Sequence, residues 1–413
     1  MRKSVFYLMI ALSINSVSFA QSGWQIYNPP PVNSYIFSVF FTNQITGYAA
    51  GSGGKILKTT NAGINWLQIA SGTAEDLMSV YFTDANNGTA AGSSGLILRT
   101  SNGGANWIQQ SSGLSGFIAS VFFKNVNTGW AAGQNGKIIK TTNAGINWNQ
   151  VNSGTAEFLI SIFFITENTG WTAGYLGKIL KSTDGAESWS EQISGTEDYL
   201  RSVQFLNENT GWIAGDNGSV LKTTNGGTNW LMQNSGTINF LQSVSFTDIN
   251  TGWISGNNGT IIRTTNSGGN WVIQNTGTVK NLNSVFFINS LIGWTAGEDG
   301  TILRTTTGGV VSVKHISSEI PAGYTLSQNY PNPFNPETKI NYTIPSNAKG
   351  EKSNVKLIIY NNLGMETEVL VNEKQSEGNY EVIFSGENLP SGVYYYKLTA
   401  GDFSETKQMM LLK

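Results

Sequence analysis

A tryptophan returns every 41 residues between positions 66 and 271, and this fixed step constrains the fold more than any other feature of the chain. The series is Trp66, Trp107, Trp148, Trp189, Trp230 and Trp271. Gly47 begins a second series and Ser38 a third, and both continue with the same step through seven members. A constant period of this size is typical of a repeat architecture, in which each unit is one supersecondary structure.

Each repeat predicts four short strands and no helix. In residues 120–150, the segments SVFF, WAAG, GKIIKTT and NWNQ are apolar, β-branched or aromatic, and turns rich in Asn and Gly separate them. Four strands in one repeat predict one antiparallel sheet of the size of a propeller blade. A single blade cannot bury both of its faces, so the blades are expected to stack around an axis.

The tryptophan series has six members, whereas the glycine and serine series have seven, so one blade lacks its tryptophan. Trp24 precedes Ser38 by 14 residues, nearly the 13 residues by which Trp66 precedes Ser79. We therefore expect the N-terminal strand to complete the blade that residues 284–309 begin. This predicts an all-β, seven-bladed propeller over residues 21–311. The alternative is an open solenoid with an atypical terminal repeat.

The turn before each tryptophan follows the pattern T-x-N/D-x-G-x-x-W and resembles the Asp-box (BNR) repeat. The whole unit resembles the propellers related to photosystem II assembly and stability factors, over residues 22–311. The first polar position is Asn in five boxes and Asp only at 184, which favours a structural role because Asn can also cap its own turn. The predicted structural residues are Asn61, Trp66, Asn102, Trp107, Asn143, Trp148, Asp184, Trp189, Asn225, Trp230, Asn266 and Trp271.

Composition argues against several classes of function. The net charge is −2 and charged residues are 12% of the chain, so no nucleic-acid partner is expected. There is no cysteine, and His315 is the single histidine, so neither a Ser-His-Asp triad nor a Cys- or His-based metal site is expected. We predict no catalytic residue, no metal and no cofactor. A glycan-cleaving hydrolase with paired carboxylates stays open as an alternative, with Asp198, Asp216, Glu298 and Asp299 as candidates.

The candidate ligand-binding residues are those that break the repeat while their neighbours keep it. They lie in the connections from an outer strand to the next inner strand and in the turns between the second and third strands, which share one mouth of the channel. Aromatic rings beside a few polar groups suit a sugar or a peptide, although packing between neighbouring loops is the favoured explanation. The predicted site consists of Phe158, Tyr175, Tyr199, Arg201, Asp216 and Phe240.

The N-terminus predicts a signal peptide over residues 1–20. Arg2 and Lys3 precede an apolar stretch, and Ser18-Phe19-Ala20 gives a small-x-small cleavage pattern, so the mature chain is expected to begin at Gln21. No later stretch is apolar enough for a transmembrane helix.

The repeat ends near residue 311, and residues 312–322 are predicted to be a linker. Residues 323–413 show alternating strands separated by Gly, Asn and Pro turns, which predicts a small Ig-like β-sandwich. This segment resembles the C-terminal (type A) sorting domain of the type IX secretion system of Bacteroidetes-like bacteria. The residues that carry the resemblance include Asn329, Pro331, Asn332, Pro333, Phe334, Gly392 and Tyr394.

The resemblance implies the type IX machinery as a partner and an extracellular or outer-membrane surface location. Taken together, the sequence predicts a secreted or surface-attached binding propeller whose ligand is a glycan or a protein. A periplasmic assembly factor, like the photosystem relatives, is a further alternative, against which the sorting domain argues.

Overall fold

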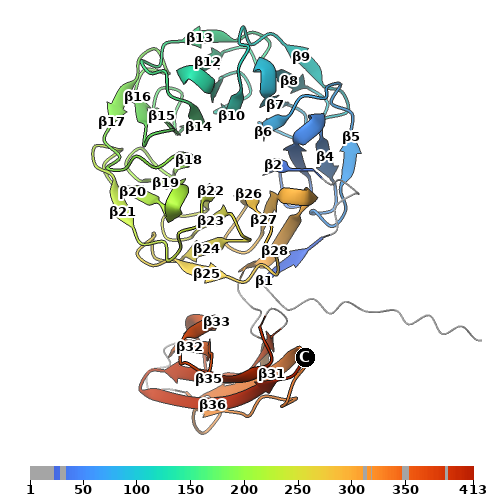
Figure 1. The fold of residues 1–413 in the computed structure, drawn as a ribbon, viewed down its shortest axis with the longest axis vertical. Helices are drawn as coiled ribbons and strands as arrows, with labels where there is room; N and C mark the ends of the chain where they lie inside the picture. Colours follow the sequence, from blue (N-terminus) through green and yellow to red (C-terminus); the bar gives the residue numbers. More distant parts are fainter. Residues whose placement is uncertain (1–22, 28–33, 310–313, 318, 347–352, 387–388) are drawn as a thin grey trace, which may run out of the picture.

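The computed structural model describes residues 23–27, 34–309, 314–317, 319–346, 353–386 and 389–413. The predicted signal peptide lies outside these residues. Seven four-stranded antiparallel sheets surround a common axis as the blades of a propeller, and two further four-stranded sheets form the C-terminal domain (Figure 1).

Consecutive strands build the first six blades from the axis outward. Blade one holds β2(Ile36–Phe41), β3(Gly47–Gly51), β4(Ile56–Thr59) and β5(Leu67–Ile69). Blade two holds β6(Leu77–Phe82), β7(Gly88–Gly92), β8(Ile97–Thr100) and β9(Ile108–Gln110). Blade three holds β10(Ile118–Phe123), β11(Gly129–Gly133), β12(Ile138–Thr141) and β13(Asn149–Val151). Blade four holds β14(Leu159–Phe164), β15(Gly170–Gly174), β16(Ile179–Ser182) and β17(Ser190–Gln192); blade five holds β18(Leu200–Phe205), β19(Gly211–Gly215), β20(Val220–Thr223) and β21(Leu231–Gln233); blade six holds β22(Leu241–Phe246), β23(Gly252–Gly256), β24(Ile261–Thr264) and β25(Val272–Gln274). Short 3-10 turns follow the second strands of five blades, at Ser52–Gly54, Ser93–Gly95, Gln134–Gly136, Asp216–Gly218 and Glu298–Gly300.

Blade seven is assembled from both ends of the propeller, as the tryptophan spacing predicts. Its strands are β26(Leu282–Phe287), β27(Gly293–Gly297), β28(Ile302–Gly309) and, outermost, β1(Gly23–Ile26), which pairs with β28 antiparallel. Trp24 is 2% exposed, and its indole meets the Phe287 ring edge-on at 5.6 Å and 88°. The six box tryptophans meet the corresponding phenylalanines at 5.7–5.9 Å and 82–88°. Trp24 therefore occupies the vacant tryptophan position.

The glycine series has a steric role, and the serine series has a hydrogen-bonding role. A Cβ atom at Gly47 would lie 2.5 Å from the Phe41 ring, and each later glycine of the series faces the corresponding ring equally closely. Ser38 Oγ accepts the Val80 amide of the next inner strand at 3.2 Å, and the other serines repeat this bond around the ring. A larger side chain at the glycine would push the first two strands apart, so the series reflects packing rather than ligand binding.

Flat aromatic stacking joins neighbouring blades. The ring on the second strand of one blade lies on the phenylalanine that ends the inner strand of the next, at centroid distances of 3.5–3.7 Å. The pairs are Tyr48–Phe82, Trp130–Phe164, Trp171–Phe205, Trp212–Phe246, Trp253–Phe287 and Trp294–Phe41. Several of these rings also donate to a box carbonyl of the next blade, as Trp171 Nε1 does to Gly226 O at 3.3 Å. These contacts bury both faces of each blade.

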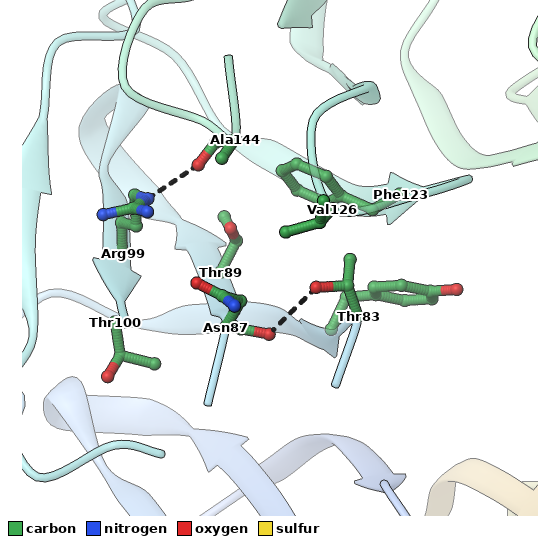
Figure 2. Close-up of a pocket in the computed structure, with 10 residues that line it drawn as sticks. Thr83, Asn87, Thr89, Arg99, Thr100, Phe123, Val126 and Ala144 are labelled. Carbon is green, nitrogen blue, oxygen red and sulfur yellow. Dashed lines mark hydrogen bonds between the residues drawn. The ribbon is translucent and has the colours of Figure 1, made fainter. Parts of the chain in front are cut away.

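Blade two departs from this pattern because Thr89 occupies the aromatic position. A cavity of about 10 Å³ lies beside it, between Thr89, Arg99, Phe123, Val126 and Ala144 (Figure 2). Arg99 Nε donates to Ala144 O at 2.7 Å across the same interface. This space holds roughly one water molecule and is too small for an organic ligand.

The Asp-boxes form self-contained turns. In blade one the Thr59 hydroxyl donates to Asn61 Oδ1, which also accepts the Asn65 amide at 2.9 Å, and Gly63 N donates to Thr59 Oγ1 at 3.0 Å. Asp184 makes the same turn in blade four; hydrogen bonds from Ser188 lead the interactions that lower its pKa to about 2. Asn and Asp serve the turn alike, which supports a structural role for the boxes.

The C-terminal domain is a sandwich of two antiparallel sheets. One holds β29(Lys314–Ser317), β34(Gly378–Ser385), β31(Glu337–Ile344) and β30(Thr325–Leu326), in that spatial order; the other holds β33(Glu366–Gln375), β32(Ser353–Tyr360), β35(Gly392–Ala400) and β36(Phe403–Leu411). Their inner faces share one core that includes Ile340, Val382, Leu357 and Tyr396. The predicted linker, residues 312–322, thus contains a strand of this domain, β29.

Replacing Trp24 by Ala tests the role of the closing strand. We expect the free energy of unfolding to fall by about 3–5 kcal/mol, because a large indole is lost from a closed core together with its 2.9 Å hydrogen bond to Gln274. Chemical denaturation of the full chain measures the change. Gln25→Ala is the matched control, since Gln25 is exposed on the same strand. Equal midpoints for the two variants would contradict closure through this strand.

Candidate functional site

The predicted site lies on the mouth of the propeller where the connections between blades meet the turns after the second strands. Main-chain hydrogen bonds join the two kinds of loop: Tyr175 N donates to Phe158 O, and Asp216 N donates to Tyr199 O, both at 2.9 Å. All six predicted residues lie on loops or strand starts of blades four to six. Figure 1 shows the inner strands of these blades, β14, β18 and β22, around the axis. We call this group the mouth arc: Phe158, Tyr175, Tyr199, Arg201, Asp216 and Phe240.

Three aromatic rings form one half of the mouth arc. Tyr175 and Tyr199 stack with centroids 3.9 Å apart and planes within 2°, and Phe158 meets Tyr175 at 5.2 Å. All three are half-buried. Each tyrosine therefore has one face covered by the other, and the surface they offer consists of ring edges, hydroxyls and outer faces.

An ion pair and a cation–π contact form the other half. Arg201 binds Asp216 through both Nε and Nη2, and the second of these bonds measures 3.0 Å. The guanidinium carbon also lies 5.7 Å from the centre of the Phe240 ring, which is 39% exposed. The charge of Arg201 is thus neutralised within the protein, and its planar face is held beside an exposed ring.

The remaining candidate carboxylates are also engaged. Burial raises the pKa of Asp198, but hydrogen bonds from Ser219, Asn217 and Thr196 outweigh it and bring the pKa below its ordinary value. Asp299 pairs with Lys280, and Glu298 accepts the Asn281 amide at 3.3 Å. Each carboxylate stabilises a loop of this face.

Two exposed aliphatic residues on the same face were not singled out from the sequence. Ile238 is 85% exposed and Val279 is 80% exposed, at corresponding positions in the connections that lead into β22 and β26. The same position holds Ala, Ser, Ala and Glu in four other connections. The change from a small or polar residue to a branched aliphatic one could therefore have identified these two residues in the sequence. With Phe240 and Leu176, which is 55% exposed, they give this face an apolar character.

The third strand of every blade carries one cation at the same position, and these cations have a packing role. They are Lys58, Arg99, Lys140, Lys181, Lys222, Arg263 and Arg304. Lys58 Nζ donates to Gly103 O in the box of the next blade at 2.7 Å, and Lys222 Nζ donates to Ser267 Oγ at 2.7 Å. Lys181 and Arg263 lie over the stacked indoles of their own blades. These heads are committed to the interfaces between blades.

The sorting motif divides into buried and exposed residues. Asn329 is 2% exposed, and its side-chain amide donates to Pro331 O at 3.0 Å and Thr338 Oγ1 at 2.9 Å. Phe334 is buried and exchanges main-chain bonds with Met410 and Leu412, while the Tyr394 hydroxyl donates to Pro390 O. Pro331, Asn332 and Pro333 are exposed between the buried anchors. Gly392 begins β35, opposite Leu411.

Within the described residues, no three His, Asp or Glu side chains gather where they could hold a metal ion. No helix in the described part of the chain has the length and apolar character needed to cross a membrane.

Two family models match the chain. The model described as photosynthesis system II assembly factor YCF48 matches residues 62–156 and 147–234, and the secretion system C-terminal sorting domain model matches residues 328–412. The C-terminal sandwich is therefore a type IX sorting domain, which indicates export to the cell surface or the extracellular space. No curated protein matches the chain significantly.

Solved propellers share the fold. A structure of YCF48 bound to D1 peptide is 18% identical, with a TM-score of 0.60, and the match covers 69% of this chain and 95% of that one. YCF48 from Cyanidioschyzon merolae is 20% identical with a TM-score of 0.58, covering 68% and 98%. The WD40 repeats of RRP9 are 11% identical with a TM-score of 0.61, covering 69% and 97%. These likenesses concern the fold alone.

The environment of Glu368 predicts that the stability of the sorting domain depends on pH. It lies on β33 opposite the inward-facing Ile359, and burial raises its pKa to about 7. Because the folded state binds the proton more tightly than the unfolded state, stability falls as pH rises from about 4.5 to about 7. Glu368→Gln should therefore stabilise the domain at pH 8, by at most about 3 kcal/mol, and leave it unchanged near pH 4. Urea titrations followed through amide signals of β32 and β35 measure this, and an equal effect at both pH values would contradict it.

Proposed function

We propose that the chain is an exported propeller that binds a protein partner through the mouth arc and the exposed aliphatic residues beside it. The observation that carries the proposal is the exposed Phe240 ring beside Arg201, whose charge Asp216 neutralises. The exposed Ile238 lies in the same connection, and the exposed Val279 lies at the corresponding position of the next connection. Aromatic residues and arginine dominate the binding energy of protein interfaces, and exposed apolar patches mark such surfaces.

A protein partner suits the geometry better than a glycan. A sugar ring stacks on an open aromatic face, but Tyr175 and Tyr199 cover one face of each other. Highly exposed branched aliphatic side chains favour an apolar partner surface over a hydroxyl-rich one. The peptide in the YCF48 structure is a precedent for peptide recognition by a propeller of this kind.

The two alternatives have weaker support. A paired-carboxylate hydrolase needs a protonated acid, which enzymes obtain by raising its pKa, whereas Asp216 is ion-paired and the pKa of Asp198 is lowered. A periplasmic assembly factor is disfavoured because the sorting domain directs the chain onward to the surface.

The double variant Tyr199→Ala, Arg201→Ala tests the binding surface. Affinity for a partner captured from the cell surface should fall about tenfold or more for each lost anchor, with the fold retained. Titration calorimetry with the purified partner measures this. Tyr35→Ala, Phe37→Ala changes the corresponding positions of blade one and is the matched control. If the control weakens binding as much as the test variant, the mouth arc is not the site.

Truncation tests the role of the sorting domain. A chain that ends at residue 313 keeps all seven blades and loses the sandwich, so the propeller should fold but stay inside the outer membrane. Cell fractionation and surface protease accessibility measure this. Normal display of the truncated chain on the surface would contradict the assignment.

A further inference from the structure

The connection into blade three lacks a side chain that its counterparts possess. The corresponding position holds Ser34, Glu75, Glu157, Asp198, Asn239 and Lys280 in the other connections, but Gly116 here. Four of those polar side chains bond to the turn of the blade they lead into. Glu75 meets Ser94, Asp198 meets Asn217 and Ser219, Asn239 meets Asn258 and Thr260, and Lys280 meets Asp299.

A cavity of about 150 Å³ lies where the missing side chain would reach. It is lined by Leu114, Phe117, Gln134, Asn135, Lys137 and Gln150, among others. Asn135 and Lys137 correspond to Asn217 and Ser219, the two groups that donate to the Asp198 carboxylate in blade five. The cavity is therefore a carboxylate cradle without a carboxylate of its own.

The positive charge of Lys137 is also unbalanced. In blade four the corresponding Lys178 pairs with Glu191 at 2.6 Å, but the residue corresponding to Glu191 in blade three is the neutral Gln150. Among the described residues, no carboxylate lies within ion-pair distance of the Lys137 ammonium. The half-buried Lys137 and the exposed Asn135 both line the cavity, and both side chains carry hydrogen-bond donors.

We propose that this cavity binds the carboxylate of a Glu or Asp side chain from a partner peptide. The Lys137 ammonium and the Asn135 amide donate to the two oxygens, and Leu114 and the 45% exposed Phe117 contact the methylene stem. A peptide is favoured over an acidic sugar because the occupants of the corresponding positions, Glu75 and Asp198, are themselves acidic side chains that enter from a peptide chain. The site lies on blade three and does not depend on the mouth arc.

N-acetylglutamate amide and its glutamine analogue provide the direct test on the full chain. In amide-resolved NMR titrations, the glutamate compound should shift residues 113–117 and 134–137 with a Kd on the order of millimolar, and added salt should weaken it. The glutamine compound should produce at most a tenth of this affinity. Equal binding of both compounds, or no shift at these residues, would overturn the proposal, and tighter binding of glucuronate would overturn the assignment to a peptide.

Variants separate the cavity from the rest of the surface. Gly116→Glu supplies an internal carboxylate and should abolish binding. It is sterically accessible after a small shift of one side chain, because a Cβ atom at Gly116 would meet the Gln134 side chain, with Oε1 at 2.9 Å and Cβ at 3.4 Å. Lys137→Gln should weaken binding about tenfold, whereas Lys178→Gln, the blade-four control, should leave it unchanged. Binding that persists in both Gly116→Glu and Lys137→Gln would refute the site, and an unchanged amide spectrum outside blade three verifies that the variants fold.

Discussion

Flat stacking of one aromatic ring on the phenylalanine of the next blade is the contact on which the ring of blades depends. It recurs at six of the seven interfaces at 3.5–3.7 Å, and its seventh occurrence is replaced by Thr89 with a water-sized gap. Six blades supply a ring to the next blade, and only blade two does not, so the packing of each blade depends on its neighbours. The serine bond between inner strands and the cation that reaches the next box act across the same interfaces. Most of the repeated polar residues thus serve assembly, which leaves function to the positions that vary.

The architecture could be predicted from the sequence because each periodic residue has one steric or hydrogen-bonding task that other residue types perform poorly. Gly47 and its counterparts lie against a ring where no Cβ fits, and Trp24 could be assigned to blade seven from its spacing alone. The strand β29 was not predicted, because its pairing with β34 is set by residues more than sixty positions away. Short segments of this kind carry too little local signal for sequence reasoning.

The candidate site could be predicted only in part. The residues of the mouth arc could be identified because they depart from the repeat. Their contacts could not: Tyr175 stacks on Tyr199, and Asp216 binds Arg201. The corresponding Ser52 instead accepts a hydrogen bond from a loop amide. These pairings depend on side-chain directions set by three blades together. The cavity of blade three was harder to predict, because it exists where Gly116 has no side chain. The importance of that missing side chain is visible only from the hydrogen bonds that the corresponding residues make in other blades.

The sharing of blade seven between the two ends of the propeller also sets the order in which the fold can form. The first six blades are meanders of consecutive strands, so each can form from local contacts as soon as its residues are available. Trp24 and Gln274 are 250 positions apart, and their contact requires that nearly the whole propeller be present. The entropy cost of closing a loop grows only logarithmically with the number of residues in it. The large separation of Trp24 and Gln274 therefore adds little to the free-energy cost of their contact. Without β1, blade seven would end at β28 with an unpaired strand edge, so the earliest strand of the propeller completes the blade that is made last in the sequence.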